Sequence, residues 1–182
     1  MARRTDTAKR EEAAGRRIAV TVAAGGSIFG VLIPYGIVKA GVALDRMLKA
    51  PSFFAGVPNL LAGGILAAGG FSLAVWTIAA QLSRGRGTPL PLMPTQRLLT
   101  DGPYAVCRNP MALGTLIAYL GVGTAAGSPC GLGVVVVLGC LLLAYVRVVE
   151  ERELERRFGS AYRAYRTRVP FLFPKVSSLR RK

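Results

Sequence analysis

The chain has no histidine, and its 182 residues include only 9 acidic ones against 24 lysines and arginines. Without histidine it cannot use an imidazole as an acid–base catalyst or metal ligand, and it cannot form a Ser-His-Asp triad. Its three cysteines, Cys107, Cys130 and Cys140, are odd in number and follow no regular spacing. They predict neither a disulfide framework nor a zinc motif, so we expect no metal centre.

Charge of either sign is missing from long parts of the chain. None occurs between Arg108 and Arg147, whereas lysines and arginines crowd the two ends and one middle loop. The net charge of +15 would suit a nucleic-acid-binding protein, but 52% of the residues are hydrophobic and the mean hydropathy is +0.41. Basic flanks around apolar spans are typical of integral membrane proteins. We therefore predict the lipid bilayer as a partner and no nucleic acid.

Four apolar runs have about the length that crosses a membrane: 18–38, 58–82, about 110–127 and 129–149. Without a break, the last two would form one helix of about 57 Å, far longer than a hydrocarbon core of about 30 Å. Gly127-Ser128-Pro129 supplies the break and makes a hairpin. The sequence predicts an all-α integral membrane protein with four transmembrane helices, or five.

The last part of the chain has the pattern of an amphipathic helix. Apolar or aromatic residues recur there at steps of three and four, namely Leu154, Phe158, Tyr162, Tyr165 and Val169. Arginines occupy the other faces. We expect this helix to lie on the membrane or to fold back over the second hairpin.

These patterns divide the chain into a basic tail (1–17), a transmembrane hairpin (18–82), a region with a polar loop, the second hairpin and the C-terminal helix (83–174), and a second basic tail (175–182). Four spans place both termini on the same side of the membrane. The termini and the loop carry nearly all the lysines and arginines, so the positive-inside rule predicts that they are cytoplasmic. The loop then meets the end of the fourth span at the cytosolic face.

Two acidic residues, Glu150 and Glu151, stand at that end of the fourth span. One interpretation is a hydrated helix end, in which Glu153 and Arg157 form an ordinary ion pair one helical turn apart. The other is a functional carboxylate that binds an ammonium group or faces a cationic centre, since ionisable groups at membrane depth are usually turned inward and paired. The pattern alone leaves both open.

Arg108 precedes Asn109 and Pro110 at the start of the third span. One interpretation is an interfacial arginine whose charged group reaches the water, followed by a polar cap and a proline in the first helical turn. The other is a functional arginine whose guanidinium binds a carboxylate through two hydrogen bonds.

Many residues of the carboxyl-terminal half form one ordered signature: Gly102, Pro103, Tyr104, Val106, Arg108, Pro110, Met111, Gly114, Glu150, Glu151, Leu154, Phe158, Gly159, Tyr162, Tyr165, Val169, Pro170 and Pro174. In this order they resemble the isoprenylcysteine carboxyl methyltransferase family, part of a wider group that includes the phospholipid methyltransferases. The similarity covers about residues 97–174. The first two spans carry no such signature.

The resemblance implies a membrane enzyme that uses S-adenosylmethionine (SAM) to methylate a lipophilic acceptor at the cytosolic face. It implies cofactor binding by Gly102, Pro103, Tyr104, Arg108, Asn109, Pro110, Gly114, Glu150 and Glu151. It makes Arg108 and Glu151 the candidate catalytic residues, and it gives Tyr162, Tyr165 and Arg168 contact with the substrate. We predict O-methylation of a carboxylate or hydroxyl on a small lipophilic acceptor, whose identity the sequence leaves open, as it does the oligomeric state.

Two positions depart from the family pattern. Asn109 stands where the family has histidine, and Ala112 stands where tyrosine is common. Asparagine donates and accepts hydrogen bonds but does not titrate near neutral pH. Two alternatives therefore remain: an NADPH-dependent enzyme similar to sterol reductases, and a non-enzymatic membrane scaffold that retains a degenerate SAM pocket.

Overall fold

The computed structural model describes residues 15–16, 18–51, 56–85 and 95–173, and every regular element among them is helical. This confirms the all-α prediction. In chain order the elements are η1 (Ile28–Leu32), α2 (Ile33–Leu48), α3 (Val57–Ala80), η2 (Gln81–Gly85), α4 (Pro103–Val106), α5 (Pro110–Ala125), α6 (Pro129–Tyr145), η3 (Val146–Glu150) and α7 (Glu151–Arg168), where η marks a π-helical turn. The tail predicted at 175–182 and most of that at 1–17 lie outside the described residues.

Three helical stretches within the described ranges are long and apolar enough to cross a membrane. They are Ile18–Leu48, Val57–Gly85 and Pro129–Arg168. The third predicted span, about 110–127, corresponds to α5, which is apolar but has only 16 residues, a length of about 24 Å. It ends early because Gly127 takes a left-handed conformation (φ 61°) and Ser128 caps the start of α6 by accepting a hydrogen bond from Gly131 N.

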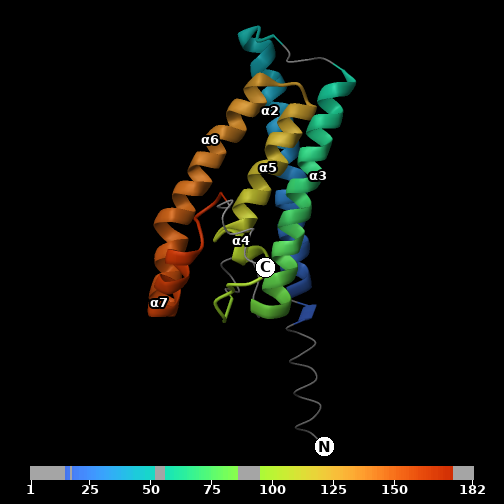
Figure 1. Cartoon of the computed structure of the whole chain (residues 1–182). Coiled ribbons are helices and arrows are strands. Elements are labelled where there is room, and N and C mark those ends of the chain that lie inside the picture. Colours follow the sequence, from blue (N-terminus) through green and yellow to red (C-terminus); the bar gives the residue numbers. More distant parts are fainter. Residues whose placement is uncertain (1–14, 17, 52–55, 86–94, 174–182) are drawn as a thin grey trace, which may run out of the picture.

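Helices α3 and α5 lie side by side with their backbones in direct contact (Figure 1). Glycines make this approach possible. A Cβ atom on Gly63 would lie 2.5 Å from the carbonyl oxygen of Gly121, and one on Gly70 would lie 2.5 Å from that of Gly114. Close contact between small residues is a common way for helices to associate in membranes, where hydrophobic burial offers little driving force. The α3–α5 pair is therefore the most closely packed pair of helices in the described part of the bundle.

The glycine contact gives a stability prediction. Gly70→Val should destabilise the protein by about 1–3 kcal/mol, because the added side chain forces the two backbones apart. The matched control is Gly69→Val, since a Cβ atom at Gly69 has no neighbour within 4 Å. Thermal unfolding in detergent measures both. Equal melting temperatures for the two variants would show that the helices are not in backbone contact.

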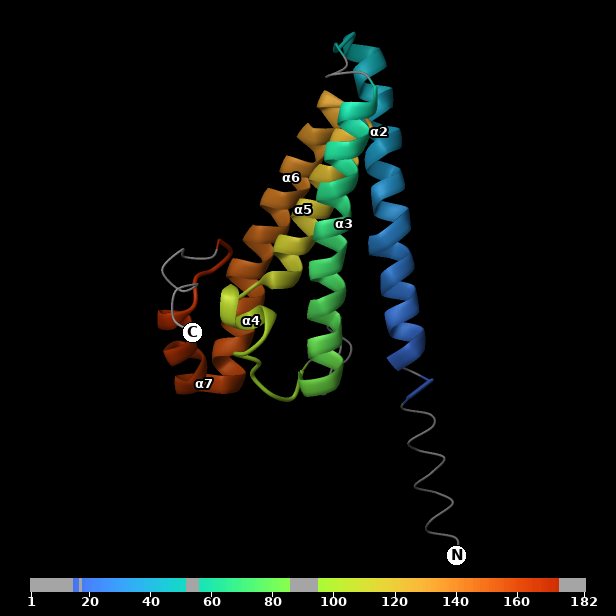
Figure 2. The same ribbon diagram turned by 45° about the vertical axis from the view of Figure 1, so that its right-hand side comes forward.

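At one end of the bundle the first helix is tied to α6. The carboxylate of Asp45 accepts hydrogen bonds from Ser128 Oγ (2.5 Å) and Cys130 N (2.9 Å), and Gly41 packs against Gly131. Toward the other end the first helix separates from α3 and α5 (Figure 2), and η1 has no buried residue. The first helix is thus anchored at one end and spaced from its neighbours at the other.

The C-terminal helix does not run straight. Gly159, inside α7, has left-handed backbone angles (φ 53°), and the chain turns back there (Figure 2). The returning segment reaches the start of α5, where Arg108 N donates a hydrogen bond to Pro170 O (2.9 Å). The predicted amphipathic helix therefore folds back over the second hairpin, with Tyr162 and Tyr165 on its buried side.

Candidate functional site

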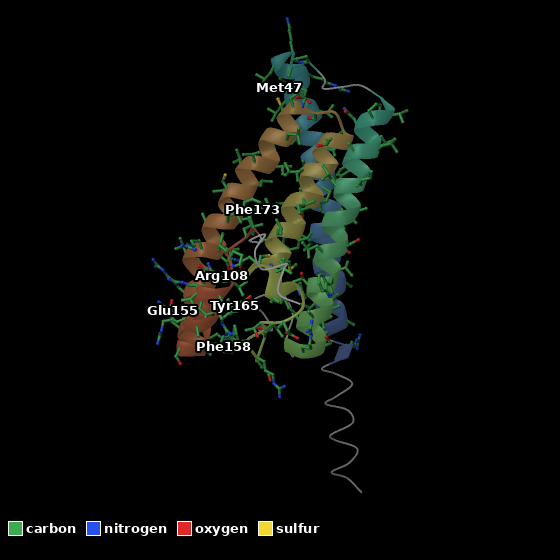
Figure 3. The ribbon with its side chains drawn as sticks, viewed as in Figure 1. Met47, Arg108, Glu155, Phe158, Tyr165 and Phe173 are labelled. Atoms are coloured by element: carbon green, nitrogen blue, oxygen red, sulfur yellow. The ribbon has the colours of Figure 1, made fainter. Side chains whose placement is uncertain are left out.

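The candidate site lies at the end of the bundle where α3 ends, α5 begins and α6 continues into α7, which we call the Arg108 end (Figure 3). Arg108 and Tyr165 lie between α5 and the returning part of α7. Glu155 points outward from α7, and Met47 marks the opposite end of the bundle. The signature residues of the loop and of the last helix therefore meet at one end of the bundle, as the hairpin arrangement predicts.

Arg108 and Glu151 form a buried ion pair. Arg108 Nη1 lies 2.9 Å from Glu151 Oε1, and the two side chains are only 7% and 5% exposed. Nη1 makes no hydrogen bond among the described residues, so charge attraction holds the pair together. Arg108 Nε is also buried without a hydrogen-bond partner among the described residues. Because unpaired buried donors are rare, this nitrogen marks a position where a ligand could accept a hydrogen bond.

Both carboxylate oxygens of Glu151 have protein partners. Its Oε1 accepts a hydrogen bond from the Tyr162 hydroxyl (3.1 Å), and its Oε2 lies 3.3 Å from Arg147 Nη1. The guanidinium groups of Arg108 and Arg147 lie 5.7 and 5.3 Å from the centre of the Phe171 ring. Glu151 thus holds two arginines in place, and each of its two oxygens already has a protein partner.

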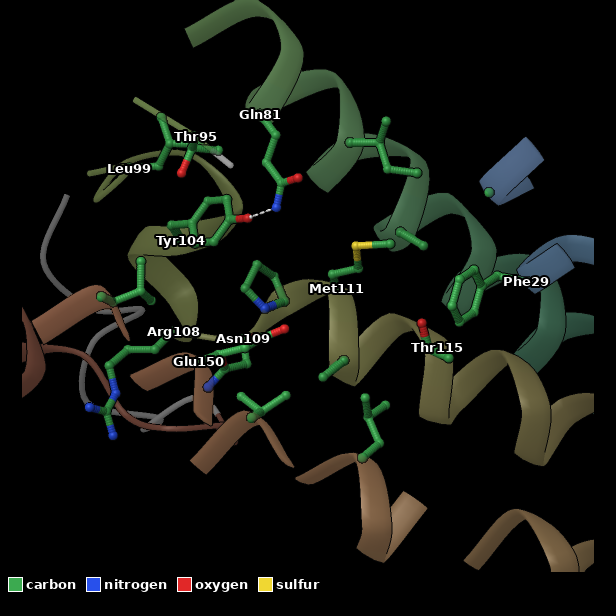
Figure 4. A pocket seen from close by; sticks show the side chains of 18 of the residues that line it. Phe29, Gln81, Thr95, Leu99, Tyr104, Arg108, Asn109, Met111, Thr115 and Glu150 are labelled. Atoms are coloured by element: carbon green, nitrogen blue, oxygen red, sulfur yellow. Dashed lines mark hydrogen bonds between the residues drawn. The ribbon is translucent and has the colours of Figure 1, made fainter. Parts of the chain in front are cut away.

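Glu150 has a different environment from its neighbour. It lines a cavity of about 570 Å³, and its carboxylate forms no ion pair or hydrogen bond within the described part of the chain (Figure 4). The polar part of the cavity also includes Tyr104, Arg108, Asn109 and Tyr165. A cavity of this size is typical of small-molecule sites. Glu151 is therefore part of the protein's own ion-pair network, whereas Glu150 faces the cavity.

Tyr104 lies in α4 on the cavity wall, and its hydroxyl accepts a hydrogen bond from Gln81 Nε2 (2.5 Å; Figure 4). Burial raises the pKa of Tyr104 to about 12, so this phenol stays protonated at neutral pH. The hydroxyl of Tyr165 donates to Tyr104 O (2.7 Å) and fixes α4 against α7. Gln81 Oε1 is buried without a described partner. Sequence reasoning missed Gln81, although an amide at the end of an apolar run was its signal.

Asn109 lines the cavity and donates a hydrogen bond from Nδ2 to Phe171 O (3.0 Å). An N–H group of histidine could make the same bond, so asparagine can keep this anchoring role. Ala112 also lines the cavity and packs in a core cluster with Val146 and Leu172. Sequence reasoning overlooked Phe171, whose carbonyl holds Asn109 and whose ring lies against both arginines.

The predicted site residues fall into two groups. The cavity is lined by Tyr104, Arg108, Asn109, Pro110, Glu150 and Tyr165. The others lie outside its lining: Gly102, Pro103, Gly114, Glu151, Tyr162 and Arg168. Gly102 has a positive φ of 58° and packs beside Arg84, while Gly114 belongs to the α3–α5 contact. Arg168 is exposed and bonds to Ala164 O of its own helix.

A family profile matches the greater part of the chain. The phospholipid methyltransferase profile matches residues 58–161, more than half of the chain. The chain belongs to the phospholipid methyltransferase family. The family and the three long apolar helices together make it a membrane protein of methyltransferase type. The match begins at the second helix, so the similarity to the family extends beyond the signature region of 97–174 and includes α3.

A curated relative gives a shorter match. The chain is 32% identical over 83 residues to the cobalt-zinc-cadmium resistance protein CzcN of Cupriavidus metallidurans. The alignment covers 46% of this chain and 38% of the relative, so the chain spans less than half of that protein's length. No solved structure matches the chain significantly.

Proposed function

We propose that this family member transfers a methyl group from SAM to an oxygen atom of a small lipophilic acceptor. One observation carries the proposal: a single cavity contains a carboxylate without a described partner, from Glu150, beside a buried arginine, Arg108, whose Nε is unsatisfied. Opposite charges at adjacent positions suit a ligand that bears both an ammonium and a carboxylate. SAM is such a ligand.

The residues present fit the cofactor. Glu150 would accept hydrogen bonds from the methionyl ammonium, and Arg108 Nε would donate to the methionyl carboxylate. Glu151 would position Arg108 without touching the cofactor, because its oxygens already serve Arg108, Arg147 and Tyr162. When bound, the cofactor supplies an electrophilic methyl group on sulfur. The protein then has to orient the acceptor and keep water out.

The nature of the acceptor decides whether a base is needed. A carboxylate is already ionised at neutral pH and needs none. A hydroxyl has to lose its proton, and Glu150 and Glu153 are the carboxylates that line the cavity. Tyr104 does not act as this base, because its pKa of about 12 keeps it protonated. We also propose that the Arg108 end faces the cytosol, where soluble SAM is available and where the basic segments are expected.

The test uses purified protein in lipid nanodiscs with tritium-labelled SAM. We expect saturable SAM binding and transfer of label into the organic extract, and we expect Arg108→Gln to lower both. The matched control, Arg156→Gln, alters an exposed arginine of α7 and should leave both unchanged. Saturable NADPH binding without SAM binding would point to a reductase, and binding of neither would point to a scaffold. Either result would refute the proposal.

A further inference from the structure

The cavity continues well beyond the polar site. From the Arg108 end it runs between the first helix, α3 and α5, where its walls are largely apolar. This part includes Phe29, Phe71, Val75, Ile78, Met111 and Tyr119. In Figure 4, Phe29, Met111 and Thr115 lie on the side away from Arg108 and Glu150. One continuous cavity, charged at one end and apolar at the other, has the polarity of an amphiphile with a single chain.

The first helix contributes glycines, which have no side chain, to the wall of this cavity. Gly26 and Gly30 line it one helical turn apart, and a Cβ atom on either would meet nothing within 4 Å. The space that ordinary side chains would fill is therefore left open. These glycines do not serve helix packing, unlike Gly70 and Gly114, because no atom of another helix in the described part of the chain lies within 4 Å of a Cβ placed on either.

A hydrogen bond joins two residues that line the cavity at the end away from Arg108. The Tyr119 hydroxyl donates to Phe29 O (2.7 Å), a carbonyl that the helix itself leaves unpaired. In the π-helical turn, Ile33 N bonds to Ile28 O, and the next residue, Pro34, has no N–H to donate. The Tyr119 ring also belongs to the core cluster with Ile37, Ala118 and Val135, where tight packing begins.

We propose that the first helix is the specificity element for the acceptor, and that one unbranched aliphatic chain lies along Gly26 and Gly30 and ends at the Tyr119–Phe29 bond. This inference rests on the proposed function, since the chain is taken to belong to the methyl acceptor. Asn109 and Tyr119 are ten residues apart on α5, a distance of about 15 Å. That length is close to an extended dodecyl chain. The acceptor is therefore a single-chain amphiphile of medium length.

The experiment uses fatty acids with a photoreactive diazirine at the terminal carbon, in octanoic, dodecanoic and hexadecanoic forms, with the full-length protein in nanodiscs. Dodecanoic probe should label peptides containing Phe29 and Tyr119. Gly30→Leu should lower the apparent affinity for dodecanoic relative to octanoic probe by about ten-fold or more, since each displaced methylene is worth about four-fold. The matched control is Gly36→Leu, an exposed position on the same helix outside the cavity.

A second variant tests the closed end. Tyr119→Phe keeps the ring but removes the bond to Phe29, so labelling by hexadecanoic probe should rise relative to dodecanoic probe. An unchanged preference in both Gly30→Leu and Tyr119→Phe, or label found only on outward-facing residues, would overturn the inference. The labelling needs no SAM. Loss of SAM binding with correct labelling would therefore refute the proposed function alone, whereas absent labelling with intact methyl transfer would refute the chain site alone.

Discussion

Replacing Glu151 by glutamine should lower the stability of the folded protein by about 3–5 kcal/mol, because the change leaves Arg108 as a buried charge without its counter-ion. Both side chains are more than nine-tenths buried, so solvent cannot compensate for the loss. Arg147 and the Tyr162 hydroxyl would also lose the negative charge that they share. Thermal or denaturant unfolding in detergent micelles, followed by circular dichroism, measures the effect.

Two variants make this expectation specific. Glu155→Gln, which removes a partly exposed carboxylate from the same helix, should have a small effect because exposed ion pairs contribute little. The double variant Arg108→Met with Glu151→Leu should regain much of the stability lost in Glu151→Gln, since apolar side chains can replace a buried ion pair. A Glu151→Gln protein as stable as Glu155→Gln would show that the pair does not hold the fold together.

Glu150→Gln should have the opposite profile, with normal stability and weakened SAM binding. We expect a loss of about ten- to one-hundred-fold in affinity, because a hydrogen bond to a charged group contributes about 1.5–3 kcal/mol. Folding should be unaffected, since the Glu150 carboxylate has no partner among the described residues. Isothermal titration calorimetry with SAM, on protein in nanodiscs, gives the affinity directly.

The matched control for that variant is Glu153→Gln. Glu153 also lines the cavity, but its carboxylate lies 3.6 Å from Arg157 Nη1 and is 55% exposed. The Glu153→Gln variant should therefore keep nearly normal affinity for SAM. If Glu153→Gln weakened binding as much as Glu150→Gln did, general negative charge in the cavity, rather than a specific contact to Glu150, would explain the effect.

The sequence predicted the meeting of Arg108 with the paired acids, because a hydrophobic stretch too long for one span has to fold back on itself. It could not predict which acid faces the cavity. Adjacent residues on a helix point about 100° apart, and their final orientation depends on the π-helical turn η3 directly before Glu151. Such turns do not follow the 3.6-residue period, so the apolar pattern gives no signal for them.

The same reason explains the other features that sequence reasoning missed. Gln81 begins the turn η2, and Phe29 lies in the turn η1, so their places on the cavity wall follow from local changes of helical period. Gly159 is part of the family signature, yet nothing in its spacing distinguishes a reversal of the chain from ordinary packing. The gross arrangement thus follows from hydropathy and charge, whereas the wall of the cavity depends on backbone irregularities.

The reversal at Gly159 has a consequence for biosynthesis. Arg108 and Asn109 are held by backbone groups of Pro170 and Phe171, which leave the ribosome more than sixty residues later. A nascent chain that has already inserted its first three apolar helices still lacks the backbone groups that hold Arg108. The site is therefore complete only when translation is almost finished, and we expect a product that terminates before Pro170 to lack the bonds that hold Arg108 and Asn109.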